Sequence, residues 1–188
     1  MKPYFQNDWS TLYCGDCRDI IPSLEYDTTF LDPVPDNPTM PLRNSERARD
    51  FLKEITDHLN GKLVICYLPA STDPRFLNMN PIWPFAGAFA CFGYNIAYCY
   101  GERGTHEDKE LCSMWRGGGA RVHPCPADFY DTHWLLFRFG RGVVLDPLAG
   151  IGTTLLAARV LRMKSIGIEI EERFCELAAR RLDARDPF

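Results

Sequence analysis

The sequence lacks the features of a membrane-spanning or secreted chain. Among its 188 residues, no window approaches eighteen uninterrupted apolar residues, the length that a transmembrane helix requires. The first residues, MKPYFQNDWSTLY, have no basic segment followed by an apolar one, which is the pattern of a secretory signal. We therefore expect a cytoplasmic protein that has no membrane partner.

An excess of positive charge is also missing. Lysine and arginine number 21 against 25 acidic residues, for a net charge of −4. Proteins that coat nucleic acid by charge alone are usually basic, because neutralised phosphates supply most of their affinity. This balance disfavours such a protein but leaves room for one local basic face. With 46% hydrophobic and 24% charged residues, the chain has ordinary globular composition and the length of one α/β domain.

The eight cysteines lack the arrangement that a zinc site requires. Cys14 and Cys17 have CxxC spacing, but no second pair with similar spacing exists. Several others lie in apolar runs such as LVICYL, where cysteine behaves as a small buried hydrophobe. We therefore favour reduced thiols and no metal, with a zinc or redox role for the CxxC pair as the alternative.

Segments typical of strands and helices alternate along the chain. The patterns predict strands over 11–13, 27–31, 62–68, 89–100, 142–145 and 165–168, and helices over 45–61, 128–140, 153–161 and 171–184. Residues 69–85, rich in proline and asparagine, read as an irregular loop, and residues 101–121 as a flexible polar loop. We expect one α/β domain spanning 1–188, a mostly parallel sheet with helices on both faces.

The sharpest motif is VVLDPLAGIGTT over 143–154, where an apolar strand enters a turn with two glycines and then a helix. The glycines let the backbone approach a ligand, and the helix N-terminus offers unpaired N–H groups to an anionic group. Ligands of open α/β sheets bind at this edge. Leu155 stands where a dinucleotide fold has its third glycine, and no lysine follows as in a P-loop, so nicotinamide and ATP are disfavoured.

The next predicted strand ends in Glu169. A carboxylate at the tip of the second strand is where an α/β fold holds the hydroxyls of a ribose. The expected ligand therefore combines a ribose with a charged group.

The segment DPLAGIGTTLLAARVLRMKSIGIEIEERFCELAARRL resembles the C-terminal part of the amino-group DNA methyltransferases, which modify adenine N6 or cytosine N4. It is similar to their circularly permuted class, in which the catalytic motif precedes the cofactor motif. Gly15-Asp16-Cys17 and His123-Pro124 resemble the GDC and HP segments of the same family. The resemblance implies the fold of S-adenosylmethionine-dependent methyltransferases and S-adenosylmethionine as cofactor.

The resemblance also implies a role for individual residues. Glu169 would bind the ribose hydroxyls, Asp16 would face the adenine, and His123 with Pro124 would flank the methionine portion. The methionine end would be lined by Asp146, Pro147, Gly150, Gly152 and Thr153. Structural alternatives stay open: Asp16 as a turn cap, His123 as a structural hydrogen-bonding residue, and the DP segment with its glycines as a plain turn.

The family's catalytic motif, (D/N/S)PP(Y/F/W), corresponds here to Asp32-Pro33-Val34-Pro35, of which the first two residues match. The carboxylate of Asp32 and the carbonyl of Pro33 would accept the two N–H bonds of an exocyclic amine and direct its lone pair toward the sulfonium methyl. Pro35 replaces the aromatic residue that stacks on the extruded base, a contact worth roughly 1–3 kcal/mol. An ordinary turn at the end of a strand is the alternative reading.

Other aromatic residues are candidates for the missing stack: Tyr26, Phe30 and Trp83. Further departures lie at Ala127 and Asp128, in place of the lysine and second proline of HPxxKP, and at Leu148 and Ile151. Together they leave open an inactive protein on the same fold that binds DNA, cofactor or a partner subunit.

DNA recognition has the weakest signal, because the interval 36–122 must also supply a helix and strands. Phosphate contacts are predicted for Arg103, Arg116 and Arg121 in the loop 101–121, although acidic neighbours make a solvated loop the alternative. No separate recognition domain is expected. DNA, as a duplex with a flipped base or as a single strand, would then be read with loose sequence preference or through a homodimer or partner subunit.

The combined prediction is an enzyme, a site-specific DNA methyltransferase. Adenine N6 is favoured over cytosine N4, because aspartate at position 32 is more typical of the adenine enzymes. A compact member without a recognition region is typical of phage or restriction-modification systems. The alternatives are the inactive protein and a methyltransferase for RNA or a small molecule.

Overall fold

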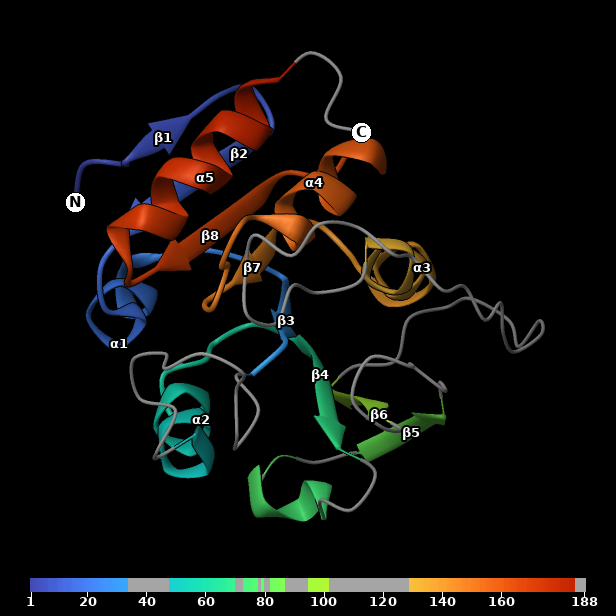
Figure 1. Cartoon of the computed structure of the whole chain (residues 1–188). Coiled ribbons are helices and arrows are strands. Elements are labelled where there is room, and N and C mark those ends of the chain that lie inside the picture. Colours follow the sequence, from blue (N-terminus) through green and yellow to red (C-terminus); the bar gives the residue numbers. More distant parts are fainter. Residues whose placement is uncertain are drawn as a thin grey trace.

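The structure is a computed structural model of the chain that describes residues 1–33, 48–69, 73–77, 79, 82–86, 95–101 and 129–184 (Figure 1). Its elements in chain order are β1 (Phe5–Gln6), β2 (Ser10–Cys14), α1 (Cys17–Ile20), η1 (Ile21–Ser23), β3 (Thr28–Leu31), α2 (Ala48–Thr56), β4 (Leu63–Pro69), η3 (Pro74–Leu77), β5 (Ile82–Ala86), β6 (Asn95–Gly101), α3 (Phe129–Phe139), β7 (Val144–Asp146), α4 (Thr153–Val160), β8 (Ser165–Glu169) and α5 (Glu172–Asp183).

The described strands form one sheet in the order β1-β2-β8-β7-β3-β4-β6-β5. Strands β2, β8, β7, β3 and β4 pair in parallel. β1 is antiparallel to β2, and β6 is antiparallel to both β4 and β5. The predicted mostly parallel α/β sheet is therefore confirmed. The carboxyl ends of β2, β8, β7 and β3 lie next to one another at one edge.

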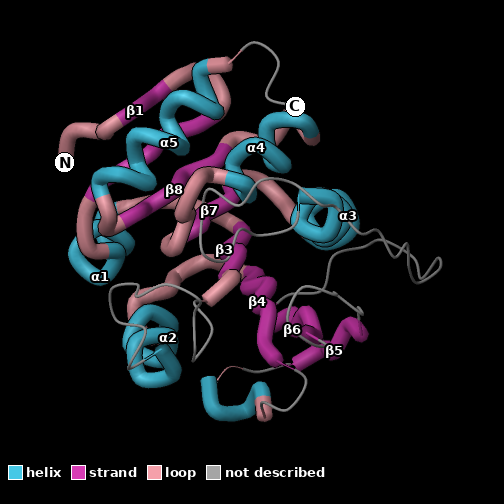
Figure 2. The backbone as a smooth tube through the Cα atoms, viewed as in Figure 1, coloured by secondary structure: helices cyan, strands magenta, loops and turns pink. Residues whose placement is uncertain are grey.

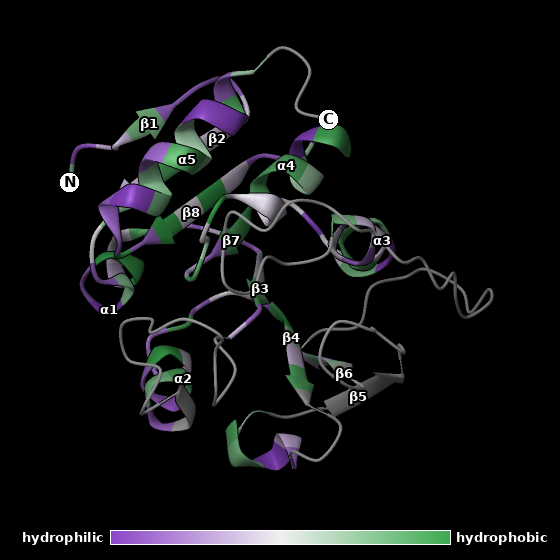
Figure 3. Ribbon diagram, in the orientation of Figure 1, coloured by the Kyte–Doolittle hydropathy of each residue, from purple (hydrophilic) through white to green (hydrophobic). Residues whose placement is uncertain are grey.

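Helices cover both faces of this sheet, with α3, α4 and α5 on one face and α1 and α2 on the other (Figure 2). Successive strand residues face opposite layers, as the period of a β-strand requires. Phe30 and Val144 pack with the α3 and α4 side, whereas Leu31 and Leu145 pack with the α1 and α2 side. The strands β3 and β4 are accordingly hydrophobic (Figure 3). No helix in the described ranges is long and apolar enough to cross a membrane.

The expected loop over 69–85 is wrong in part, because Ile82–Ala86 forms strand β5. Pro84 argues against a strand in the sequence, since proline has no N–H to donate to a ladder. β5 is the outermost strand and pairs with β6 alone, so a missing donor on its open side costs nothing. Of the strand predicted over 89–100, the described part begins at Asn95.

Helix α2 ends at Thr56, earlier than the predicted stop at Gly61. Gly61 has another role: a Cβ there would come within 2.6 Å of the Tyr26 ring. The hydroxyl of Tyr26 accepts the N–H of Asn60 at 2.9 Å. Close packing against an aromatic ring, rather than helix termination, therefore explains this glycine. Residues 45–47, the start of the predicted helix, lie outside the described residues.

Gly101 ends β6 with a φ of +101°, and a Cβ there would meet the backbone oxygen of Lys62 at 2.0 Å. We expect Gly101→Ala to lower the free energy of unfolding by at least about 2 kcal/mol, since both the backbone conformation and the contact oppose a side chain. Urea denaturation measures the change. Gly15→Ala is the control, because its Cβ would meet only the flexible end of Ile20 at 3.2 Å. Equal losses for the two variants would contradict this account.

Candidate functional site at the carboxyl edge of the sheet

Four neighbouring parallel strands each lead into a carboxylate at the same edge of the sheet. Asp16 follows β2, Glu169 ends β8, Asp146 ends β7 and Asp32 follows β3. The strand order β2-β8-β7-β3 sets these four positions in a row. The positions predicted for the cofactor and for catalysis, far apart in sequence, are therefore brought together at one edge.

Asp146 is a buried carboxylate, with 3% of its surface exposed. Its Oδ1 accepts the N–H of Leu148 at 3.0 Å, and the side chain of Thr154 also hydrogen-bonds to it. Burial raises the pKa of Asp146 to about 6, the charge of Glu169 adds to this, and the two hydrogen bonds oppose it. The carboxylate is thus fixed in place but electrostatically strained.

The turn after Asp146 owes its shape to Gly150 and Gly152, whose φ angles are +51° and +79°. The expectation that this turn offers unpaired N–H groups is wrong at several positions. The N–H of Gly150 binds Glu169 Oε2 at 2.9 Å, that of Ala149 binds the carbonyl of Ile168, and that of Gly152 binds the carbonyl of Ala149. The glycines serve first to let the chain adopt this conformation.

Glu169 connects this turn to the end of β8. Its Oε2 accepts the N–H of Gly150 and its Oε1 accepts the N–H of Glu171 at 2.7 Å. Burial raises its pKa although both hydrogen bonds favour the charged form. A carboxylate has about four acceptor positions, so two backbone donors leave room for the hydroxyls of a ligand.

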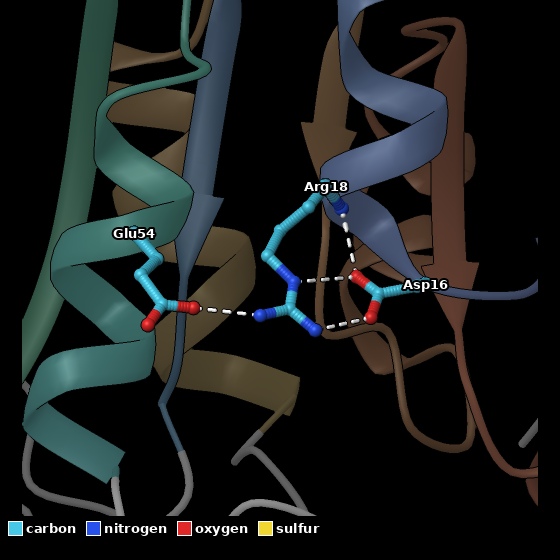
Figure 4. Close-up of polar contacts among 3 residues, drawn as sticks. All are labelled: Asp16, Arg18 and Glu54. Atoms are coloured by element: carbon cyan, nitrogen blue, oxygen red, sulfur yellow. Dashed lines mark hydrogen bonds and ion pairs between the residues drawn. The ribbon is translucent and has the colours of Figure 1, made fainter.

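Asp16 caps helix α1, as its structural alternative held, by accepting the N–H of Arg18 at 3.0 Å (Figure 4). The guanidinium of Arg18 returns to the same carboxylate, with Nη2–Oδ2 at 2.5 Å and Nε–Oδ1 at 3.0 Å. Its Nη1 reaches Glu54 Oε2 of α2 at 2.6 Å. The carboxylate expected to face an adenine is thus held by an arginine that also joins α1 to α2.

Asp32 and Pro33 follow β3 and are partly buried. Burial, with the nearby charge of Asp146, raises the pKa of Asp32 to about 7. β3 and β7 are neighbours in parallel, which sets the carboxylate predicted to be catalytic beside the glycine turn. The site therefore contains two acids on adjacent strands that oppose each other's ionisation.

Two of the aromatic residues considered as replacements for the base-stacking residue are excluded by their positions. Phe30 is fully buried and packs edge-to-face against Tyr67, with ring centroids 5.8 Å apart. Tyr26 is also buried, and it lies before β3, against Gly61 at the opposite edge of the sheet. The side chain of Trp83 lies outside the described residues.

The other predicted site residues also fall outside the part of the chain that the structure describes. They are Pro35, His123, Pro124, Arg103, Arg116 and Arg121. Within the described ranges, no group of three or more His, Cys, Asp or Glu side chains could hold a metal ion.

Sequence reasoning missed Arg18, Glu54 and Arg181. Arg18 lies two residues from Asp16, a spacing that could have pointed to a carboxylate–guanidinium pair. Arg181 in α5 donates to the carbonyl of Ile151 at 2.6 Å, from 30 residues away. No local pattern in the sequence indicates that contact.

Comparison with known proteins gives one family. The family model described as DNA methylase matches residues 28–180. The type II methyltransferase M.ScaI of Streptomyces caespitosus is 51% identical over 43 residues, a match that spans 23% of this chain and 14% of that protein.

Solved structures share the fold at low sequence identity. The M1.HpyAVI–SAM complex has a TM-score of 0.66 at 16% identity, covering 93% of this chain and 100% of that one. The PvuII cytosine-N4-specific DNA methyltransferase has a TM-score of 0.73 at 12% identity, covering 98% and 90%. A DNA modification methylase from Thermus thermophilus, complexed with S-adenosyl-L-methionine, has a TM-score of 0.59 at 19% identity, covering 90% and 91%. The predicted methyltransferase fold is confirmed.

The raised pKa of Asp32 makes stability depend on pH. In the unfolded chain this carboxyl titrates near 4, and in the folded chain it titrates at about 7. Between these values the unfolded state is more ionised, so the stability of the wild type falls as pH rises, and the penalty is complete above pH 7. We expect Asp32→Asn to exceed the wild type by roughly 2 kcal/mol in free energy of unfolding at pH 8, and to match it at pH 4.

Urea denaturation at pH 4, 6 and 8 measures this difference. The control is Asp57→Asn, because Asp57 is an exposed carboxylate just after α2. A gain at pH 8 that persists unchanged at pH 4 would show that the effect of Asp32→Asn does not come from ionisation.

Proposed function

This chain belongs to the DNA methylase family of N6- and N4-methyltransferases, and we propose that it transfers a methyl group from S-adenosylmethionine to the N6 amine of adenine in DNA. The observation that carries the proposal is the row of carboxylates at the ends of β8, β7 and β3, placed around a glycine turn. Glu169, Asp146 and Asp32 are the members of this row.

The residues fit such a cofactor on electrostatic grounds. S-adenosylmethionine carries positive charge on its sulfonium and amino groups. Asp146 and Asp32 are acids whose pKa values are raised by burial, and the negative charge of Asp146 adds to the effect on Asp32. A neighbouring cation would favour the ionised form of both. The edge of the sheet is therefore suited to a cationic ligand and unsuited to a phosphate.

Each described residue has a proposed part in binding. Asp146, Pro147 and the turn Gly150–Thr153 would hold the methionine portion, and Glu169 would use its remaining acceptor positions for the ribose hydroxyls. Asp16 would face the adenine from the end of β2, in exchange for one of its contacts with Arg18. When bound, the cofactor supplies an electrophilic methyl group on a sulfonium sulfur.

Asp32 and Pro33 would act on the target amine. An exocyclic amine is a poor nucleophile, because its lone pair is delocalised into the ring. The carboxylate of Asp32 and the carbonyl of Pro33 would accept its two N–H bonds and direct the lone pair outward. Fixed acceptors in a partly buried site do this without the reorganisation that water would need.

DNA is the proposed substrate and partner. Arg103, Arg116 and Arg121 are proposed to contact its phosphates, on the strength of the sequence alone. A second subunit or a homodimer would supply recognition that a chain of this length lacks.

The choice of adenine rests on Asp32, and cytosine N4 is the competing base. An inactive protein on this fold is favoured by Pro35, which stands where an aromatic residue stacks on the base. Mass spectrometry of nucleosides separates these readings, because N6-methyladenine, N4-methylcytosine and unmodified bases have distinct masses.

We expect Asp32→Ala to lower methyl transfer at least about 100-fold, because it removes a preorganised acceptor from the transition state. The measurement is nucleoside mass spectrometry on DNA from a methylation-deficient host that expresses the chain. Asp57→Ala, which alters an exposed carboxylate away from the site, is the matched control.

An Asp32-dependent rise in N6-methyladenine supports the proposal, whereas N4-methylcytosine keeps the reaction and overturns the base. Methylation that survives Asp32→Ala removes Asp32 from catalysis. Unmodified DNA from a folded wild-type chain that binds S-adenosylmethionine favours the inactive reading.

We expect Glu169→Gln to weaken S-adenosylmethionine binding about tenfold, since a neutral amide is a poorer acceptor for both the backbone N–H groups and the ribose. Isothermal titration calorimetry measures the dissociation constant, and circular dichroism checks the fold. Glu176→Gln on the exposed face of α5 is the control. Unchanged affinity in Glu169→Gln would remove Glu169 from the cofactor site.

A further inference from the structure

Helix α5 lies directly behind the glycine turn. A Cβ at Gly152 would come within 3.2 Å of the Cβ of Ala178, and Leu182 lies close to the same position. Ala178 and Leu182 are four residues apart on the helix and are both buried. The turn therefore rests on the face of α5 that carries these two side chains.

Arg181 extends this face with a charged contact. Its Nη1 donates to the carbonyl of Ile151 at 2.6 Å and lies 3.4 Å from Thr153 Oγ1. The backbone ladder of α4 begins one residue after Ile151, where the N–H of Leu156 binds the carbonyl of Gly152. Arg181 thus binds a buried carbonyl that precedes the helix ladder, between the two glycines of positive φ.

The surroundings make this a strong contact. Burial lowers the pKa of Arg181, which shows that its guanidinium is partly withdrawn from water. Hydrogen bonds from a charged donor in such a place are shorter and stronger than neutral ones. An arginine kept in a desolvated position needs its acceptors there, and Ile151 supplies one.

A second arginine joins the same two helices without touching the turn. Arg159, on α4, donates to the carbonyls of Leu182 and Ala184 at 3.0 and 3.1 Å, at the end of α5. Arg159 and Arg181 therefore both attach α4 to α5, but only Arg181 reaches the residues that form the turn.

From this difference we infer that Arg181 is a positioning residue for cofactor binding, which fixes the Gly150–Thr153 turn from behind through the carbonyl of Ile151. The inference rests on the proposed function, because it assigns the turn to S-adenosylmethionine. Arg181 itself need not touch the cofactor. Its effect passes through the conformation of the turn.

The test compares Arg181→Met with Arg159→Met. Both variants remove one arginine contact between α4 and α5, so we expect similar losses of thermal stability. Arg181→Met should weaken S-adenosylmethionine binding about tenfold or more, because a loosened turn must be ordered again on binding. Arg159→Met should bind the cofactor as the wild type does. Calorimetric titration and thermal unfolding supply the two readouts.

Arg181→Lys is the third variant and protects the test from a fold failure in Arg181→Met. Lysine keeps the charge and can donate to one carbonyl, but it lacks the planar geometry of the guanidinium. We expect its affinity to lie between those of the wild type and Arg181→Met.

Three outcomes would overturn the inference. Wild-type affinity in Arg181→Met is one, and equal loss of affinity in Arg159→Met is another, because the effect would then be general destabilisation. A wild-type chain that binds no S-adenosylmethionine overturns the proposed function together with this inference, so the two failures are distinguishable.

Discussion

Burial of like charges side by side is the constraint on which the site depends. Parallel strands β8, β7 and β3 end at one edge, so the carboxylates of Glu169, Asp146 and Asp32 lie near one another and partly out of water. Backbone N–H groups of the glycine turn offset part of this repulsion at Asp146 and Glu169. The turn is therefore shaped as much by the acids as the acids are held by the turn, and neither element has its geometry alone.

Arginine contacts extend this arrangement into both helical layers. Arg18 connects the acid after β2 to α2 on one face of the sheet, and Arg181 connects the glycine turn to α5 on the other. Each guanidinium is partly buried and has acceptors on two separate segments. The edge of the sheet is thus tied to elements that are not adjacent to it in sequence, which stabilises loops that carry little apolar surface of their own.

The C-terminal block could be predicted almost completely from sequence, because strand, glycine turn and helix each have a local pattern over 143–184. Asp32 could be placed because it directly follows a strand with a clear β pattern. Other features have no such pattern. The edge strand β5 contains Pro84, which local rules disfavour in a ladder, and its tolerance depends on its position at the end of the sheet. Phe30 is a candidate for an exposed role in the sequence, but whether an aromatic residue faces the core depends on which layer covers it.

The central place of β3 has a consequence for how the chain folds. β3 lies between β4 and β7, yet β4 follows it closely whereas β7 begins at Val144. During synthesis, the edge of β3 that later pairs with β7 stays open until most of the chain has left the ribosome. Such long-range parallel pairing is slow, and an apolar strand with an open edge invites pairing with other chains. C-terminal truncations that remove β7 would leave this edge unprotected in the finished product, and aggregation rather than partial function is the physical outcome for such fragments.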